Sequence, residues 1–139
     1  MKIIDQEFSF HSGHDLGEEG ITPGWFAVSH HLLDADQRHS REYYGQWHKI
    51  SCGRKSVYRC LRLSPNLKKN ASEIEIAIDW DAWCRLAGGD SKKPVKLSIR
   101  KACVFEPMLF GGHPDPMQRA AYQIAFIGLL ISLLQLIHY

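Results

Sequence analysis

The sequence predicts an α+β fold, in which a small β-rich domain is followed by one long apolar helix at the C-terminus. Residues 73–80 alternate between bulky apolar residues and small or polar ones, residues 95–101 do so again, and residues 121–139 (AYQIAFIGLLISLLQLIHY) carry no charge. A period of two is typical of a half-buried strand, and an uncharged run of that length needs apolar surroundings. A chain of 139 residues with 23% charged and 11% aromatic residues suits one folded domain with an appendage.

Residues 1–50 predict an irregular, acidic segment that packs on the core or leads into it. Glycine and proline interrupt these residues repeatedly, so the pattern indicates only a strand at 25–29 (WFAVS) and a short helix at 32–44. Residues 1–36 contain seven acidic residues against one lysine, whereas residues 37–72 contain nine basic residues against one glutamate. This segregation indicates either that the two segments pair with each other or that they face different partners.

Residues 51–106 predict the β-rich core. Residues 57–63 (VYRCLRL) form a β-branched and aromatic run that ends at a Ser-Pro-Asn turn, which is typical of a strand. In the strand at 73–80, we expect one set of side chains to point into the core and the other to point outward. The inward set is Ile74, Ile76, Ile78 and Trp80, and the outward set is Glu73, Glu75, Ala77 and Asp79.

A short helix and a last strand complete this core. Asp79 or Asp81 can cap a helix at 82–86, which the pair Gly88-Gly89 ends. A strand follows at 95–101 with Val95, Leu97 and Ile99 inward, and 102–105 extend it.

The order of elements in residues 73–101, a strand, a short helix, a Gly-Asp turn and a second strand, resembles the half-barrel unit of swapped-hairpin (AbrB-like) and related small barrels. The apolar residue that this family usually has between the Gly and the Gly-Asp is absent here. The resemblance implies a barrel-like arrangement of the β-rich domain, and no function is carried over from it.

Residues 107–118 predict a linker rich in glycine and proline, and residues 119–139 predict an apolar helix that crosses a membrane. The eighteen residues 120–137 would span ~27 Å as a helix, and ten of them are Leu, Ile or Phe. These ten favour insertion by ~3–6 kcal/mol. Arg119 precedes the run and nothing basic follows it, which predicts a cytoplasmic body and a single pass. The alternative is a core or oligomerisation helix of a soluble protein.

One face of this helix carries its small and polar residues. This helix-packing stripe consists of Ala121, Ala125, Gly128, Ser132 and Gln135. Small residues at such spacings let two helices approach closely in lipid, and a glutamine can donate a hydrogen bond across the contact. We therefore expect a second copy of the chain, or a partner helix, against this stripe.

The acid-free stretch 43–72 is rich in cations and aromatic residues. We expect a basic binding surface from Lys49, Arg54, Lys55, Arg62, Lys68 and Lys69. Arg59 falls on the opposite face of its strand from Arg62, so these two side chains cannot share one patch. Three interpretations remain open for this stretch: a solvated surface that pairs with the acidic segment, a surface for lipid headgroups, or a surface for nucleic acid.

No residue pattern predicts catalysis, a metal site or a cofactor. Eight histidines are present, but no HExxH motif and no pair of cysteines at finger spacing accompany them. The best pair for a nucleophile and its base is Cys52 with His48, for which proximity in sequence fixes no geometry.

The sequence thus predicts a non-enzymatic, membrane-anchored interaction or regulatory protein with a cytoplasmic β-rich domain. The bilayer and a second helix are its expected partners. The alternative is a soluble small-barrel regulator that binds nucleic acid and uses its C-terminal helix as a core or oligomerisation element.

Overall fold

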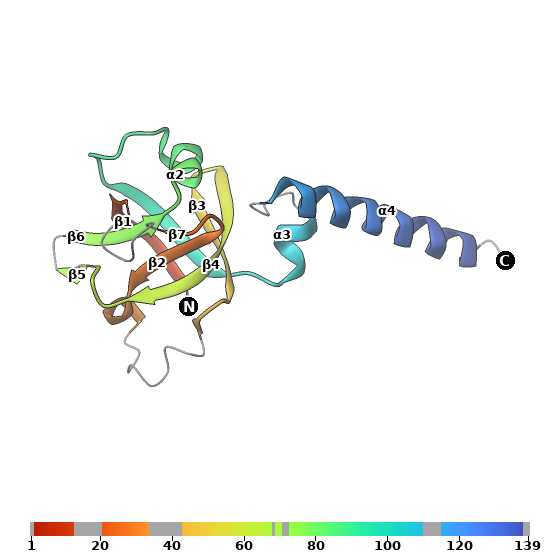
Figure 1. Ribbon diagram of the computed structural model, residues 1–139, viewed down its shortest axis with the longest axis horizontal. Coiled ribbons are helices and arrows are strands. Elements are labelled where there is room, and N and C mark those ends of the chain that lie inside the picture. The colour runs from red at the N-terminus through yellow and green to blue at the C-terminus, as the bar shows by residue number, and fades with distance from the viewer. Residues whose placement is uncertain are drawn as a thin grey trace.

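The computed structural model describes residues 2–12, 21–33, 43–67, 69–70, 73–109 and 115–137. Within these ranges, six strands close into a barrel and one long apolar helix projects from it, which confirms the predicted α+β fold (Figure 1). The strands are β1 (Lys2–His11), β2 (Trp25–Ser29), β3 (Trp47–Cys52), β4 (Lys55–Ser64), β5 (Lys69–Asn70), β6 (Glu73–Ile78) and β7 (Val95–Lys101). The helices are the 3-10 turn η2 (His30–Leu33), α2 (Trp80–Ala87), α3 (Phe105–Leu109) and α4 (Pro116–Ile137).

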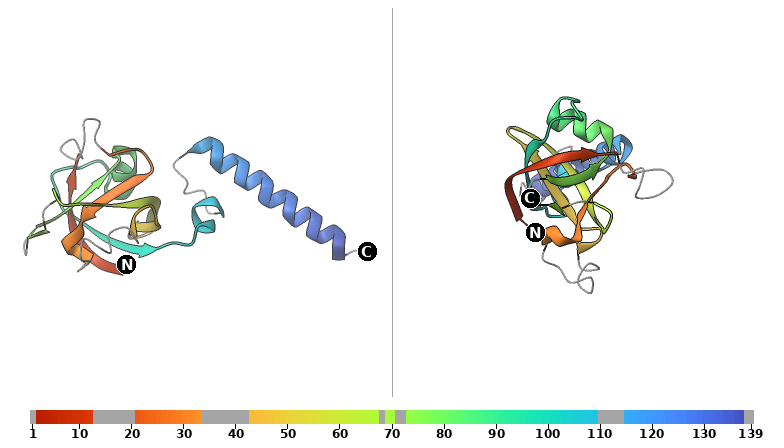
Figure 2. Two further views of the ribbon diagram at one scale, coloured as in Figure 1. Left: turned by 60° about the horizontal axis from the view of Figure 1, so that its bottom comes forward. Right: turned by 90° about the vertical axis from the view of Figure 1, so that its left-hand side faces the viewer.

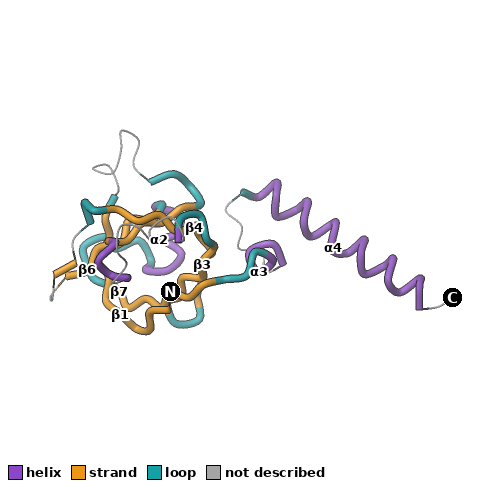
Figure 3. The backbone as a smooth tube through the Cα atoms, turned by 90° about the horizontal axis from the view of Figure 1, so that it is seen from below, coloured by secondary structure: helices purple, strands orange, loops and turns teal. Residues whose placement is uncertain are grey.

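The barrel follows the order β1-β7-β3-β4-β2-β6, and β6 pairs back to β1 to close it. Two of its pairings, β2 with β4 and β1 with β6, are parallel, and the other four are antiparallel. The view from below shows the strands as a ring (Figure 3), and β5 pairs with β6 outside this ring. Because the ring is closed, these six strands leave no open edge for unintended pairing.

Alternating side chains of all six strands fill the barrel. The inner layer contains Phe8, Phe26, Val28, Ile50, Val57, Leu61, Ile76, Ile78, Leu97 and Ile99, all of them buried. The register explains the layer, because Phe26 lies opposite both Leu61 and Ile78, and Ile50 lies opposite both Val57 and Ile99. Directly opposed residues point to the same side of a sheet, so each pair adds two side chains to the core.

Helix α2 packs on the barrel and adds Trp83 to this core, where the residue is fully buried. Its first turn is capped as predicted, because the amide of Ala82 donates to the side chain of Asp79 at 3.1 Å. The helix ends at Gly88, which adopts a left-handed conformation at φ 76°. The strand predictions at 25–29, 57–63 and 95–101 are confirmed by β2, β4 and β7.

The description of residues 1–50 as irregular was wrong at β1 and β3. In β1 the register shifts between Ile3 and Gln6, and Asp5 between them has φ 48°. This bulge interrupts the alternation of inward and outward residues from which a strand is predicted in a sequence. In β3 the inward residues are His48, Ile50 and Cys52, so the apolar alternation is weak. Of the helix predicted at 32–44, residues 34–42 lie outside the described ranges, and residues 32–33 belong to η2.

Two predictions for residues 73–105 also need correction, namely Trp80 as an inward strand residue and 102–105 as an extension of the last strand, whereas Ala77 points outward as predicted. Trp80 begins α2 instead of ending β6 and is 52% exposed, because the capping residue Asp79 turns the chain before it. Ala77 points outward but is buried beside Ala27 and Leu67, which form a second small cluster. Residues 102–105 do not extend β7, because α3 begins at Phe105.

Helix α4 projects away from the barrel in every view that shows its length (Figures 1 and 2). The predicted linker at 107–118 is shorter than expected, because α3 occupies its beginning and α4 its end. What remains between the two helices is residues 110–115.

Candidate membrane interface

Helix α4 is apolar and exposed along its whole length. Its 22 residues span about 33 Å, an 18-residue stretch within it has a mean hydropathy of 2.0, and none of its residues is buried in the protein. Asp115 caps its start, since its side chain accepts a hydrogen bond from the amide of Met117 at 2.9 Å. By length and composition the helix can cross a membrane. It is not an element of the barrel core.

The helix-packing stripe on α4 is open. Ala121, Ala125, Gly128, Ser132 and Gln135 are all exposed. The hydroxyl of Ser132 donates to the carbonyl of Gly128 at 2.9 Å, so it is satisfied within the helix. A Cβ added at Gly128 would meet no atom within 4 Å. No described residue of the chain therefore fills the space left by the missing side chain of Gly128.

A carboxylate fixes α3 to the barrel. Glu106 accepts hydrogen bonds from both terminal nitrogens of Arg100 on β7, at 3.0 and 2.5 Å, and from the amide of Cys103 at 3.0 Å. These bonds, led by those from Arg100, lower the pKa of Glu106 to about 2. The hydroxyl of Tyr58 on β4 donates to the same carboxylate at 3.4 Å, and burial together with this neighbouring charge raises the pKa of Tyr58. One side chain thus ties α3 to two strands.

Beside this anchor, three cations align across adjacent strands. Lys2 on β1 lies opposite Arg100 on β7, which lies opposite Lys49 on β3. We call these three residues the cationic row. Opposed residues share one side of the sheet, here the outer side of the barrel. The Nζ atom of Lys49 lies 5.9 Å from the ring centre of Tyr58, within reach of a cation–π contact.

The basic residues predicted from the stretch 43–72 do not form one patch. Lys49 belongs to the cationic row, Arg54 and Lys55 lie in and after the turn between β3 and β4, and Arg62 lies opposite Ala27 of β2. Lys69 is on β5 beyond the barrel, and Lys68 lies outside the described residues. Arg59, excluded from the surface by the strand pattern, is indeed buried at 4% exposure.

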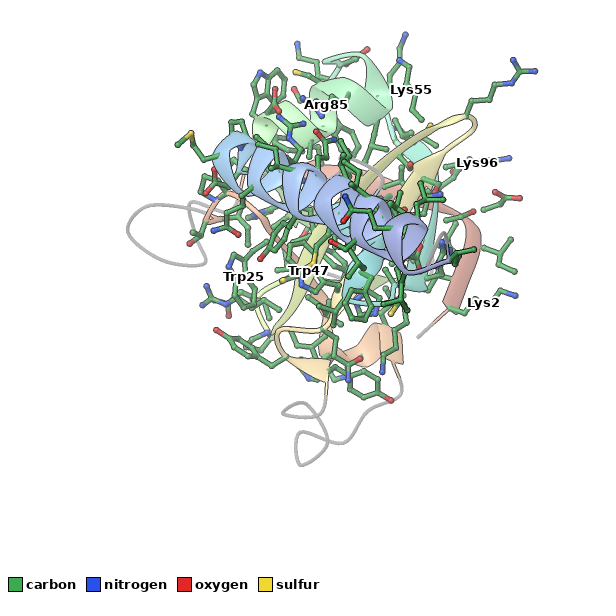
Figure 4. All side chains as sticks on the ribbon, turned by 90° about the vertical axis from the view of Figure 1, so that its right-hand side faces the viewer. Lys2, Trp25, Trp47, Lys55, Arg85 and Lys96 are labelled. Carbon is green, nitrogen blue, oxygen red and sulfur yellow. The ribbon has the colours of Figure 1, made fainter. Side chains whose placement is uncertain are left out.

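Tryptophans lie on the outer wall of the same barrel. Trp25 and Trp47 both lie opposite Cys60, one on each side of it, and the ring centre of Trp25 is 5.1 Å from that of Tyr44. Figure 4 looks at the barrel from the side of α4, with Trp25 and Trp47 on one side and Lys2, Lys55 and Lys96 along the opposite edge. Indole and phenol rings are enriched where a protein meets the headgroup layer.

Two features of this region went unnoticed in the sequence. Residues 91–105 contain five lysines and arginines and no acid, and ten residues separate them from the terminal helix, which begins at Pro116. The charge pattern alone reveals this stretch. The second feature needs the structure: an apolar collar of exposed residues where α3 meets α4, formed by Val104, Phe105, Leu109 and Met117.

The nucleophile–base pair considered from the sequence does not form. His48 and Cys52 are four residues apart on one strand, about 13 Å, so they cannot form a nucleophile–base pair. Burial raises the pKa of Cys60 to about 11, which keeps this thiol protonated at neutral pH. In the described ranges no three His, Cys, Asp or Glu side chains are grouped to hold a metal ion, and His14 and His39 lie outside those ranges.

Comparison with protein-family models finds no match to this chain, and comparison with curated proteins finds none either. The geometry that bears on function is therefore the exposed helix α4, the anchored helix α3 and the cationic row beside it.

Proposed function

We propose that this chain is a membrane-anchored, non-enzymatic interaction or regulatory protein, whose barrel is presented at the cytoplasmic surface by α4. The observation that carries the proposal is the complete exposure of α4: large apolar side chains such as Leu136 and Ile137 are 79% and 80% exposed. Exposed apolar surface of this size is strongly unfavourable in water. A bilayer removes it from water along the whole helix.

The charges around α4 support the stated orientation. Arg119 lies in its first turn, residues 91–105 add five cations, and residues 120–139 contain none. Lysine and arginine near one end of a membrane helix favour the cytoplasm for that end. The barrel would then lie in the cytoplasm.

A role in interaction fits the rest of the molecule better than an enzymatic one. The barrel interior is filled by side chains, and the described residues contain neither a paired nucleophile and base nor a metal cluster. The outer wall and the stripe on α4 are the surfaces left for partners. Both a second copy of the chain and another membrane helix suit the stripe.

Fractionation of cells that express the full chain tests the proposal. We expect the protein in the membrane fraction, resistant to alkaline carbonate and released by detergent. In a matched variant, Ile127→Lys/Leu130→Lys, two charges at the centre of the helix oppose insertion by about 5–7 kcal/mol. That exceeds the ~3–6 kcal/mol that the apolar residues contribute, so the variant should move to the soluble fraction or aggregate.

The proposal fails if the unchanged protein stays in the high-speed supernatant without detergent. In that case α4 would have to be covered by other copies, and the soluble regulator becomes the better account. That account predicts nucleic-acid binding that weakens steeply between 50 and 200 mM salt.

A further inference from the structure

We infer that the barrel does not hang freely from its membrane helix but lies with one defined surface against anionic lipid headgroups. This docking face consists of the cationic row and the apolar collar. Its occupant is the surface of a bilayer that contains anionic phospholipid. The inference rests on the proposed function, because the docking face reaches a bilayer only if α4 is inserted.

The first argument is the attachment of the barrel to its tail. Glu106 holds α3 on β7 and β4 through Arg100 and Tyr58. Helix α3 in turn contacts α4, and only residues 110–115 separate the two helices in sequence. In three views α3 lies beside the beginning of α4, not beside its far end (Figures 1, 2 and 3). An anchored α3 therefore keeps the same side of the barrel near the point of membrane entry.

The second argument is the exposure of the apolar collar at that level. Phe105 is 66% exposed, Val104 53%, and Met117 in the first turn of α4 80%. In water the exposure of these three apolar side chains is energetically unfavourable. At the boundary between headgroups and acyl chains they would be removed from water, as are the apolar faces of helices that lie in the membrane plane.

The third argument is charge. Three like charges in direct opposition repel one another, and Glu106 offsets only one of them. The acid-free stretch 91–105 adds Lys101, which is exposed and follows Arg100 in sequence, whereas Lys96 lies opposite Glu7 of β1. Cations close to a bilayer surface are attracted to anionic lipid, by about fivefold in the binding equilibrium per cation. A bilayer surface supplies a counter-charge for Lys2 and Lys49, the two cations of the row that Glu106 does not bind.

The experiment uses the full chain in nanodiscs of two compositions, phosphatidylcholine alone and phosphatidylcholine with 30% phosphatidylserine. A fluorophore is attached to Cys103, the exposed native thiol beside the collar, and quenching by nitroxide-labelled lipid reports its distance from the bilayer. A control label at Ser91→Cys, in a Cys103→Ser background, reports on the α2–β7 loop. This loop lies on the far side of the barrel from α3 (Figure 1).

We expect strong quenching at Cys103 with phosphatidylserine, weaker quenching without it, and little quenching at residue 91 in either case. In Lys2→Gln/Lys49→Gln, the equilibrium constant for docking should fall by about fivefold per lysine. The matched variant Arg54→Gln/Lys55→Gln, which removes two exposed cations outside the docking face, should keep it. Near-UV circular dichroism checks that both variants retain the barrel.

Equal quenching of Cys103 in both lipids, or equal effects of the two lysine and arginine variants, would overturn the inference. The proposed function would survive those results, because the chain would still be incorporated in the discs. Failure of the unchanged chain to enter discs at all would instead remove the proposed function itself.

Discussion

Arg59 and Asp79 form a nearly buried ion pair in the barrel. Arg59 donates to both carboxylate oxygens of Asp79, at 2.5 and 2.9 Å, and a third donor reaches the carbonyl of Tyr58 at 2.8 Å. The two side chains are only 5% and 12% exposed. Burial alone would raise the pKa of Asp79, but the bonds and charge of Arg59 and the amide of Ala82 lower it. The same carboxylate therefore closes the ion pair and caps α2.

Removing one partner should be costly. Arg59→Met leaves the Asp79 carboxylate buried without its counter-charge, and we expect the free energy of unfolding to fall by about 3–5 kcal/mol. Arg54→Met makes the same substitution at an exposed turn and should change it by less than about 0.5 kcal/mol. Urea unfolding in detergent, followed by near-UV circular dichroism, measures both. Equal effects would show that the pair does not stabilise the barrel.

His48 is another buried ionisable residue of the barrel, with no exposed surface. Its Nδ1 atom lies 3.0 Å from the carbonyl of Gln46, while its Nε2 atom has no hydrogen-bond partner in the structure. Burial lowers the pKa of His48 by more than the bond to Gln46 raises it. The neutral imidazole, which packs edge-on against Phe26, is therefore the protonation state favoured in the folded barrel.

This residue predicts a pH dependence of stability. The unfolded chain takes up a proton at His48 as the pH falls below about 6.5, whereas the folded chain resists until a lower pH. Stability should therefore decrease from about pH 6.5 downward, by up to about 1.4 kcal/mol per pH unit from this residue. His48→Phe should remove this slope, and His31→Phe, at an exposed histidine, should keep it. An unchanged slope in His48→Phe would assign the effect elsewhere.

At the scale of elements, the tail helix presents a surface that its own chain leaves open. The stripe on α4 contains a glycine whose missing side chain no described residue exploits. In lipid such a groove is where another helix approaches closely.

A substitution at this glycine tests the stripe. Gly128→Leu fills the groove, and its Cβ lies in open space beside the helix, so we expect self-association to be lost in a membrane two-hybrid assay. Leu130→Phe enlarges a residue on the opposite side of the helix and should leave the signal intact. Association that persists in Gly128→Leu would move the contact away from the stripe.

The sequence predicted those elements whose apolar pattern is regular. Strand β7 matched its predicted bounds and β4 and β6 nearly did so, because bulky residues such as Leu97 and Ile99 recur every second position. Strand β1 was missed because the bulge at Asp5 shifts the pattern, and β3 because its inward side includes His48. The cationic row could not be predicted, since it depends on which strands become neighbours, and β1, β7 and β3 are far apart in sequence.

At the scale of the whole molecule, the chain separates into a closed barrel with a filled core and a helix with no buried residue. Between them, α3 contacts α4 and is held on the barrel by Glu106, which accepts hydrogen bonds from Arg100 of β7. In the proposed arrangement, the barrel lies in water at the bilayer surface and α4 lies in the hydrocarbon of the bilayer.

The most direct test of this account is the sidedness of the two ends of α4. The full chain, with Cys52, Cys60 and Cys84 replaced by alanine, carries one thiol at a time, the native Cys103 or Tyr139→Cys in a Cys103→Ser background, in right-side-out and inverted membrane vesicles. A membrane-impermeant maleimide should modify Cys103 only in inverted vesicles and residue 139 only in right-side-out ones. Modification of both positions from the same side would contradict a helix that crosses the membrane with the barrel in the cytoplasm.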